Sequence, residues 1–355
     1  MRITLDIGPL ETSSNSNHKV RGVGRYIRLL SENLERYDKS NSYIMTSTPQ
    51  KYKTDVIHYP YFDPFFITLP LIKKYKTVVT IHDVIPLIHK KQFPVGLGGM
   101  AKWEMNKILL KRVNAVITDS HASKEDIQKV TGIISDKIFP VYLSTDNKYQ
   151  HSDNKDSKLD QIIEKYNIPK KFFLYVGDVT WNKNLPRIVA AIKKSNMPIV
   201  MVGKALVEDD FDFSNPWNKD RVKVLTEIKN NPLFHRVGFV SDEDLEVLYS
   251  NALALLMPSL DEGFGLPVLE AMEAGCPVIT SKCGSLPEVG GDAAIYVEAE
   301  SVSEITDAIM KVSNNLNLRE ELKKKGEAQA IRFSLKKMIE NTIEVYSLVH
   351  NEKEN

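Results

Sequence analysis

Several features are scarce in this 355-residue chain, and each scarcity makes one class of protein less plausible. Two cysteines, Cys276 and Cys283, are too few for a disulfide framework and indicate reduced thiols in a cytosolic protein. No apolar run approaches the roughly 20 residues that a membrane-spanning helix needs, and the best stretch, 65–72, contains a proline. The amino terminus begins directly as a strand and has no signal-peptide layout. A net charge of +1 gives no overall positive field that would attract nucleic acid. The length is sufficient for two domains, each with its own hydrophobic core.

Short apolar strands alternate with amphipathic helices along the chain, which predicts a parallel α/β architecture. The polar segment 151–158 shows no apolar periodicity and is predicted to begin a link between two such series. The tail 335–350 has helical spacing. The expected strands lie near residues 2–7, 43–47, 55–58, 77–81, 114–118 and 137–141 before the link, and near 172–176, 198–202, 235–238, 252–257, 277–280 and 294–297 after it.

The most informative segment is 261–270, which sets two carboxylates around a glycine-bracketed turn. The apolar run before it reads as a buried strand. Pro267 suits the first turn of a helix, because its missing N–H costs nothing there. The free N–H groups at the start of such a helix can bind a phosphate. One carboxylate precedes that site and the other lies inside the helix, a layout that suits a nucleotide sugar.

This segment resembles the signature of the retaining GT-B glycosyltransferases of family four, in which two glutamates are separated by seven residues. The resemblance implies an α/β GT-B fold, with two Rossmann-like, doubly wound parallel-sheet domains facing across a cleft. It implies an acceptor-side domain at 1–160, a nucleotide-sugar-binding domain at 161–334, and a last helix, 335–355, that crosses back to the first domain. The match continues in order through 239–245, 248–249, 258–259, 270–272, 275–279 and 286–294.

Sugar transfer from a nucleotide donor expels a diphosphate, and fixed positive charge lowers the barrier to that step. A strand-to-helix segment that contains Lys183 resembles the family segment in which a basic pair binds the donor phosphates. The resemblance assigns Lys183 to catalysis. The arginine of the pair is absent, because Asp178 and Asn182 stand where it would be sought. Asn182 is expected in the donor site, and either Arg187 or Arg25 could supply the second cation.

The two glutamates of the signature receive different expected roles. Glu270 is expected to accept hydrogen bonds from the ribose hydroxyls, because an ionised carboxylate only accepts and fits a vicinal diol. Glu262 is expected to contact the hexose and is assigned to catalysis. The turn between them is expected to hold sugar hydroxyls and phosphate oxygens through the backbone N–H groups of Gly263, Phe264, Gly265 and Leu266.

The first half carries a second set of polar residues. His82 follows a buried strand and resembles the family histidine that lies in the active cleft, so we assign it to catalysis. Ser120 lies in what resembles the next cleft loop and is expected to contact the donor, whereas Ser123 either joins that loop or caps the following helix. A segment that resembles the family's Gly-x-Gly-Arg-Tyr is expected to border the diphosphate or the acceptor through Gly22, Gly24 and Arg25.

Two Asp-x-Asp strings, 210–212 and 242–244, fit the pattern with which the other major glycosyltransferase fold holds a divalent cation. The first lies in a polar loop with no strand before it. The second opens a helix with the capping signature of Ser241 and Asp244. We therefore read both as incidental. No histidine pair has zinc spacing, so we expect metal-independent transfer with no cofactor besides the nucleotide-sugar co-substrate.

Lysine and aromatic residues concentrate in the first half of the chain, notably in segments 73–76 and 102–112. This segregation has two readings. The face is either simply solvated, or it docks on an anionic membrane surface that carries a lipid-linked acceptor. No nucleic-acid partner is expected, because the near-neutral chain lacks the motifs and the basic footprint of such proteins.

Together with these features, the resemblance implies a cytoplasmic hexosyltransferase that moves a sugar from a nucleotide donor to a glycan or lipid-linked acceptor, in cell-surface polysaccharide or lipopolysaccharide synthesis. Retention of configuration is implied by the resemblance alone. The matched pattern is common among mannosyltransferases, so GDP-mannose is the first donor expected, with UDP- and dTDP-sugars as alternatives. A transferase acting on a small sugar phosphate, a sugar-nucleotide epimerase and a non-catalytic sugar-nucleotide binding module remain open. The absent Gly-x-Gly-x-x-Gly fingerprint disfavours an NAD-dependent oxidoreductase.

Overall fold

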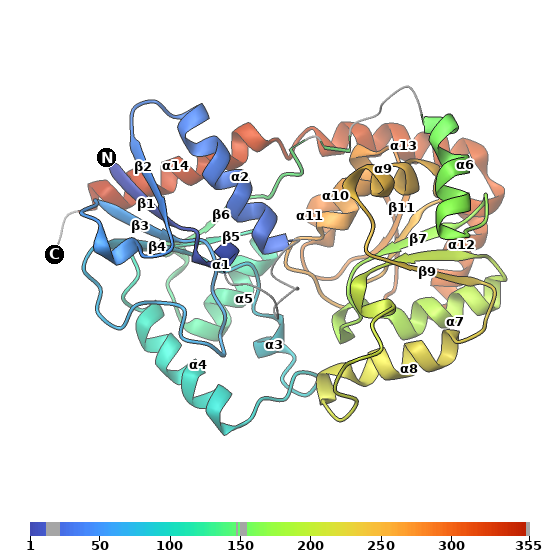
Figure 1. The fold of residues 1–355 in the computed structure, drawn as a ribbon, viewed down its shortest axis with the longest axis horizontal. Helices are drawn as coiled ribbons and strands as arrows, with labels where there is room; N and C mark the ends of the chain where they lie inside the picture. Colours follow the sequence, from blue (N-terminus) through green and yellow to red (C-terminus); the bar gives the residue numbers. More distant parts are fainter. Residues whose placement is uncertain (12–21, 147, 150–154, 353–355) are drawn as a thin grey trace. The chain divides into compact units, whose positions relative to one another are not determined.

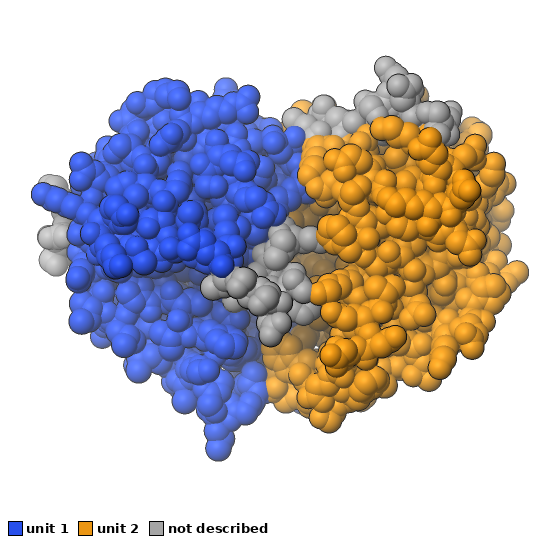
Figure 2. Space-filling model, viewed as in Figure 1, with its two compact units in different colours: residues 1–91, 95–146, 333–355 blue, residues 92–94, 147–332 orange. Residues whose placement is uncertain are grey.

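A computed structural model describes residues 1–11, 22–146, 148–149 and 155–352. The chain forms two compact units, which Figure 2 colours separately. Unit 1 comprises residues 1–91, 95–146 and 333–355, and unit 2 comprises 92–94 and 147–332. Each unit contains one six-stranded sheet, and every strand pairing is parallel, which confirms the predicted α/β class (Figure 1).

The sheet of unit 1 has the strand order β2-β1-β3-β4-β5-β6. Its strands are β1 (Arg2–Asp6), β2 (Ser42–Thr46), β3 (Val56–Tyr59), β4 (Lys76–Thr80), β5 (Ala115–Thr118) and β6 (Ile138–Pro140). The central strands are buried along their length, as parallel strands covered on both faces must be. The helices are α1 (Gly8–Glu11), α2 (Gly22–Tyr37), α3 (Ile85–Ile88), α4 (Leu97–Leu110), α5 (His121–Thr131) and α14 (Leu335–Asn351).

The C-terminal helix α14 belongs to unit 1, where it packs against α2 and the strands β3 to β5 (Figure 1). A buried hydrogen-bonded chain fastens it. The Tyr346 hydroxyl lies 2.7 Å from His58 Nδ1, and His58 Nε2 lies 2.8 Å from Thr80 Oγ1. Burial lowers the pKa of His58 to about 3, so its imidazole stays neutral at physiological pH.

Unit 2 has the strand order β12-β11-β10-β7-β8-β9. Its strands are β7 (Phe173–Val176), β8 (Ile199–Val202), β9 (Phe234–Gly238), β10 (Leu255–Met257), β11 (Val278–Ser281) and β12 (Ala294–Val297). The first strand, β7, pairs with β8 on one side and with β10 on the other. The direction in which the sheet grows therefore reverses between β7 and β10, which is the topological switch point where doubly wound sheets bind ligands.

The helices of unit 2 are α6 (Lys155–Tyr166), α7 (Leu185–Ser195), α8 (Lys219–Ile228), α9 (Asp242–Asn251), α10 (Leu266–Glu273), α11 (Leu286–Gly290), α12 (Val302–Asn314) and α13 (Leu316–Ala330). Short 3₁₀ turns lie in both units. Unit 1 contains η2 (Pro49–Lys51) and η3 (Ser135–Lys137), and unit 2 contains η4 (Trp181–Lys183), η5 (Lys204–Leu206) and η6 (Pro216–Asn218). None of the helices within the described ranges is both long and apolar enough to cross a bilayer.

Two local predictions hold and one fails. Ser241 caps α9 by accepting a hydrogen bond from the Asp244 backbone N–H at 3.1 Å, and Pro267 lies in the first turn of α10. The predicted link 151–158 is wrong for its second half, because α6 already begins at Lys155. Residues 151–154 lie outside the described ranges. The polar start of this helix hid the apolar periodicity that identifies an amphipathic helix.

Candidate functional site

Three neighbouring strands of unit 2 end beside one another at the switch point. In a parallel sheet all carboxyl ends lie at the same edge, so the loops that follow adjacent strands are brought together. Lys183 follows β7, Glu262 follows β10, and Ser285 follows β11. The predicted phosphate-binding lysine and the predicted hexose-binding glutamate therefore lie in adjacent loops, although they are far apart in sequence.

Lys183 and Glu262 form an ion pair. Lys183 Nζ lies 2.7 Å from Glu262 Oε1 and 2.9 Å from Oε2. The Ser259 hydroxyl also donates to Oε1, at 2.7 Å. The side chains of the pair are only 18% and 7% exposed, so solvent screens their attraction less than it would at the surface. These bonds use two of the three ammonium N–H donors, and the cation is held in one orientation.

Asn182 fixes the loop that carries Glu262. Its side-chain Nδ2 donates to the Asp261 carbonyl at 3.1 Å, and its own carbonyl accepts the Leu260 N–H at 2.7 Å. Its Oδ1 accepts from the Thr180 hydroxyl at 2.8 Å. The side chain is buried. The amide that stands where the family arginine would be sought therefore binds protein groups, and its expected contact with the donor stays a prediction.

The turn after β11 supports the same loop and was missed from the sequence. Ser285 donates to the Glu262 carbonyl from its N–H at 3.1 Å and from its hydroxyl at 3.0 Å. Gly284 has φ +54°, and a Cβ atom there would lie 2.5 Å from the Glu262 carbonyl oxygen. Only glycine allows this approach without displacing the loop. A glycine-serine pair directly after a buried strand was the available signal.

Helix α10 begins at this site and carries the second glutamate. Gly265 precedes the helix with φ +96°, a conformation that favours glycine, and Leu266 is its first residue. The buried Glu270 accepts a hydrogen bond at Oε2 from the Tyr249 hydroxyl at 2.9 Å. Gly263 and the buried Phe264 complete the turn between the two carboxylates. The N-terminal N–H groups of α10 thus follow closely on Glu262 in the chain.

Arg187, one of the two alternatives for the missing cation, contacts side chains of unit 2. Its Nη1 donates to Asn184 Oδ1 at 2.9 Å, and Nη2 lies 3.6 Å from Glu300. Asn184 in turn donates to the Pro258 and Ala299 carbonyls. The guanidinium therefore supports the loops around the site through Asn184.

In unit 1, a histidine–carboxylate pair forms where β4 and β5 end. His82 Nδ1 lies 2.8 Å from Asp119 Oδ2. Burial opposes the charged imidazolium, but the neighbouring Asp119 carboxylate outweighs it and raises the pKa of His82 above its ordinary value. The Tyr26 ring meets the imidazole edge-on, with centroids 5.0 Å apart, and its hydroxyl lies 3.0 Å from Thr80 Oγ1. This arrangement orients the imidazole, and Asp119 was not singled out from the sequence.

The serines beside this pair make different local hydrogen bonds. Ser120, expected to contact the donor, caps α5 by accepting the Ser123 N–H at 3.0 Å. Ser123, one reading of which was a helix cap, lies in the first turn and donates its hydroxyl to the His82 carbonyl at 3.2 Å. The capping reading of Ser123 is therefore wrong. The reason is that the helix begins at His121, before Ser123, so Ser120 occupies the capping position.

The glycine-arginine segment forms the start of α2. Gly22 is the first residue of the helix, and Gly24 lies on its buried face. The Arg25 guanidinium donates to the Thr145 carbonyl, which ties α2 to the loop after β6. The contacts proposed for these three residues with the diphosphate or the acceptor stay predictions.

A further carboxylate lies at the switch point of unit 1. Asp6 ends β1, which pairs with β2 on one side and β3 on the other. Burial raises the pKa of Asp6 to about 6, although the Gly8 N–H donates to it at 2.9 Å. Such a perturbed carboxyl group at a strand end is a candidate functional group. The only signal in the sequence was an acidic residue at the end of the first apolar strand.

Three of the four aspartates in the Asp-x-Asp strings are bonded to protein groups. Asp212 accepts the Ser214 hydroxyl at 2.6 Å, and Asp244 accepts the Lys165 ammonium and the Tyr166 hydroxyl, each at 2.6 Å. Asp242 pairs with Lys148. Over the described ranges, no group of three or more histidine, cysteine or acidic side chains is arranged to hold a metal ion.

Two doubly wound parallel sheets in one chain define the GT-B fold, and solved structures of similar fold agree. A glycosyltransferase from Rickettsia africae matches 99% of both chains with a TM-score of 0.67 and 18% identity. HepE from Anabaena, solved in complex with UDP and glucose, matches 98% of this chain and 99% of its own with a TM-score of 0.71 and 18% identity. These likenesses confirm the predicted fold class.

Two family profiles match in sequence, one in each half. The profile "Glycosyltransferase Family 4" matches residues 15–147, and "Glycosyl transferases group 1" matches residues 159–329. The chain belongs to the group 1 glycosyltransferases of family 4. The O-antigen chain mannosyltransferase RfbU of Salmonella typhimurium is 30% identical over 70% of this chain and 66% of its own length.

The serotype-specific mannosyltransferase WbdA of Escherichia coli is 27% identical over 77% of this chain. The chain spans about a third of the length of this relative.

Proposed function

We propose that the protein transfers a hexose from a nucleoside-diphosphate sugar to an acceptor hydroxyl with retention of configuration. The observation that carries the proposal is the Lys183–Glu262 pair at the switch point of unit 2, beside the start of α10. Ligands of doubly wound sheets bind at such a point, and helix N-termini favour anions. Family membership supports the same reaction.

In the proposed reaction, the bond between the sugar C1 and the β-phosphate oxygen breaks, and an acceptor hydroxyl forms a new bond to C1 on the same face. The acceptor proton passes to the departing diphosphate. Lys183 and the N–H groups of α10 stabilise the negative charge that develops on the leaving group. Because Glu262, which accepts a hydrogen bond from Ser259, holds the lysine in place beforehand, little reorganisation is needed at that moment.

The two glutamates are proposed to bind different parts of the donor. We assign the ribose hydroxyls to Glu270, whose carboxylate is oriented by the Tyr249 hydroxyl. Glu262 is assigned to the hexose hydroxyls. The backbone N–H groups from Gly263 to Leu266 are assigned to the sugar and the phosphates. In unit 1, His82 is proposed to act in catalysis, with Asp119 keeping its Nδ1 protonated.

GDP-mannose is the proposed donor, because the relatives named above are mannosyltransferases, and so is the similar MMP alpha-(1->4)-mannosyltransferase of Mycolicibacterium hassiacum. The proposed acceptor is a glycan or a lipid-linked saccharide of cell-surface polysaccharide synthesis, which two relatives named for O-antigen chains support. If this acceptor is correct, we propose that the protein acts at the cytoplasmic face of a membrane.

A thermal-shift panel of GDP, UDP, dTDP and ADP tests the donor, because a ligand stabilises the folded protein according to its occupancy. We expect GDP to raise the melting temperature most. GDP-mannose is then incubated alone and with acceptor extracts, and the products are analysed. Release of GDP and free mannose supports transferase chemistry. Conversion to another GDP-sugar would show an epimerase, and binding without any turnover would show a binding module.

A further inference from the structure

A network of buried polar side chains crosses the core of unit 1, from the C-terminal helix α14 to helix α2. Its members come from α14, β3, β4 and α2, and all are buried: Tyr346, His58, Thr80 and Tyr26. Three hydrogen bonds join them in that order, at 2.7, 2.8 and 3.0 Å. The two helices that carry the ends of this network pack against each other (Figure 1).

Every hydrogen bond of the network can be made without a buried charge. Burial lowers the pKa of His58 to about 3, so its neutral imidazole has one nitrogen that donates and one that accepts. Burial also raises the pKa of the Tyr26 and Tyr346 hydroxyls above the ordinary value, so both keep their protons. Together with the Thr80 hydroxyl, the four groups carry four protons for three hydrogen bonds, so each bond has a donor.

The network fixes the ring of Tyr26. Burying polar groups costs free energy that apolar side chains of similar size do not cost, but a fully hydrogen-bonded network holds each member in one orientation. The orientation of the Tyr26 ring matters because its neighbour is the His82 imidazole. The two rings meet at 90°, with centroids 5.0 Å apart.

Tyr26 and Asp119 restrain His82 in different ways. Asp119 Oδ2 lies 2.8 Å from Nδ1 of the imidazole, and this bond fixes the position of one ring nitrogen. A single hydrogen bond still allows the imidazole to tilt about it, and the Tyr26 ring limits that tilt by packing against the imidazole. The direction in which Nε2 of His82 points therefore depends on both contacts.

We propose that Tyr346, His58 and Thr80 are positioning residues for His82, which they orient through the Tyr26 ring. This inference rests on the proposed catalytic role of His82. It gives the C-terminal helix a part in the reaction, because Tyr346 lies 288 residues after its partner in the sequence. A proton relay fits less well, because the contact between Tyr26 and His82 is ring to ring.

Steady-state kinetics and imidazole NMR of the full-length protein test the proposal. Thr80→Val keeps the shape of the side chain but breaks two of the three hydrogen bonds, so Tyr26 loses its anchor. We expect kcat to fall roughly tenfold with little change in KM, which is within the range for one neutral hydrogen bond. The pKa of His82 should fall, because the imidazole is then held less firmly against Asp119.

Two further variants follow the network to its far end. Tyr346→Phe removes only the last hydrogen bond, so kcat should fall less, by roughly threefold. Adding it to Thr80→Val should lower kcat no further, because both changes act through one network. Thr80→Ser keeps the hydroxyl and should restore both kcat and the titration of His82.

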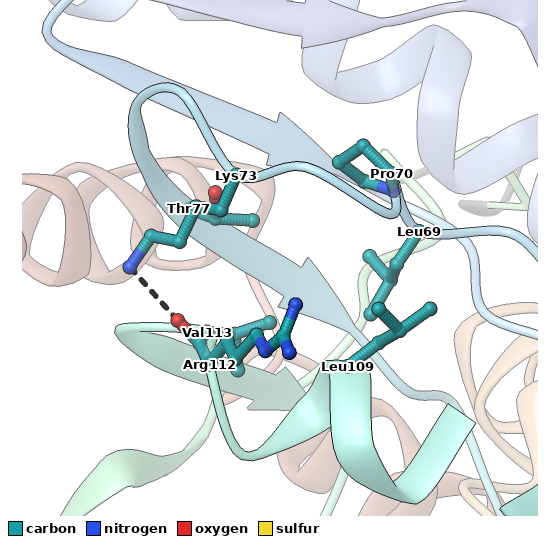
Figure 3. Close-up of a pocket in the computed structure, with 7 residues that line it drawn as sticks. All are labelled: Leu69, Pro70, Lys73, Thr77, Leu109, Arg112 and Val113. Carbon is teal, nitrogen blue, oxygen red and sulfur yellow. Dashed lines mark hydrogen bonds between the residues drawn. The ribbon is translucent and has the colours of Figure 1, made fainter. Parts of the chain in front are cut away.

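Thr77→Val is the matched control in the same strand. Thr77 is also a buried threonine of β4, and its hydroxyl donates to the Tyr75 carbonyl at 2.9 Å. It lies toward the other end of the strand, where it lines a small depression (Figure 3). This variant also loses a buried hydroxyl, but it should keep the kcat and the His82 titration of the wild type.

The two measurements separate this inference from the proposed reaction, because the NMR titration requires no turnover. An unchanged His82 titration in Thr80→Val would overturn the positioning role, whatever happens to kcat, and would leave the transfer reaction standing. Equal effects of Thr77→Val and Thr80→Val would overturn it too. A shifted titration with unchanged kcat would support the orientation of His82 by the network, and would instead remove His82 from the proposed reaction.

Discussion

The ammonium of Lys183 is held by both carboxylate oxygens of Glu262, at 2.7 and 2.9 Å, across 79 residues of sequence. The two side chains follow strands β7 and β10, which are neighbours at the switch point of unit 2. Neither group is therefore an independent feature of the site. The carboxylate keeps the cation ordered and mostly buried, and the cation compensates the charge of a carboxylate that is 7% exposed.

Replacing Lys183 should lower the turnover number strongly, while the protein still folds. Lys183→Ala is expected to lower kcat by roughly a hundredfold or more, the order that follows the loss of a charge-stabilising group. Steady-state kinetics with the preferred donor measure the change. Lys193→Ala is the matched control, because Lys193 pairs with Glu227 at 3.1 Å on an exposed surface of the same unit. Equal kinetics for the two variants would remove Lys183 from the mechanism.

Glu270 should recognise the ribose hydroxyls. A hydrogen bond to a charged group contributes about 1.5–3 kcal/mol, so Glu270→Ala should weaken nucleotide binding by roughly 10- to 100-fold. Calorimetric titration with the nucleotide and with its 2′-deoxy analogue forms a double-mutant cycle. The variant and the wild type should bind the deoxy analogue with more similar affinities. Independent, additive losses would show that the carboxylate contacts another part of the donor.

Asp119 should control the titration of His82. The pKa of His82 is raised above its usual value of 6.5 by this carboxylate. The resulting stabilisation is complete below pH 6.5 and is lost as the pH rises through the higher pKa of the folded state. In Asp119→Asn the largest influence that raises the pKa is lost while burial remains, so the pKa of His82 should fall, as NMR of the imidazole protons can measure. Asp160→Asn, at an exposed carboxylate, should leave the titration unchanged. An unshifted His82 in Asp119→Asn would contradict this assignment.

Gly284 should position the Glu262 loop through its lack of a side chain. In Gly284→Ala, the new Cβ would lie 2.5 Å from the Glu262 carbonyl oxygen, so the loop must move. A displacement of about 1 Å can cost roughly a hundredfold in rate, and we expect a loss of that order in kcat. Gly132→Ala is the control, because its φ is also positive, at +71°, but no atom lies within 4 Å of the added Cβ. Comparable kcat values in both variants would mean that backbone strain, and not displacement, matters.

The sequence predicts the alternation of elements well, because buried strands and amphipathic helices have distinct periodicities. It does not predict the first turn of α6, which is polar, or the start of α5, which capping decides. Motifs identify Lys183 and Glu262 individually. Their bond depends on strand order, which no local pattern encodes. Asp6, Asp119 and Gly284 were missed for the same reason, because each acquires its meaning from a neighbouring strand.

The central claim is that Lys183 binds the β-phosphate of the donor. The most direct test is calorimetric titration of wild type and Lys183→Ala with a nucleoside diphosphate and with the corresponding monophosphate. The account predicts that the substitution weakens diphosphate binding by roughly 10- to 100-fold and leaves monophosphate binding nearly unchanged. Equal losses for both nucleotides, or no loss for either, would contradict it.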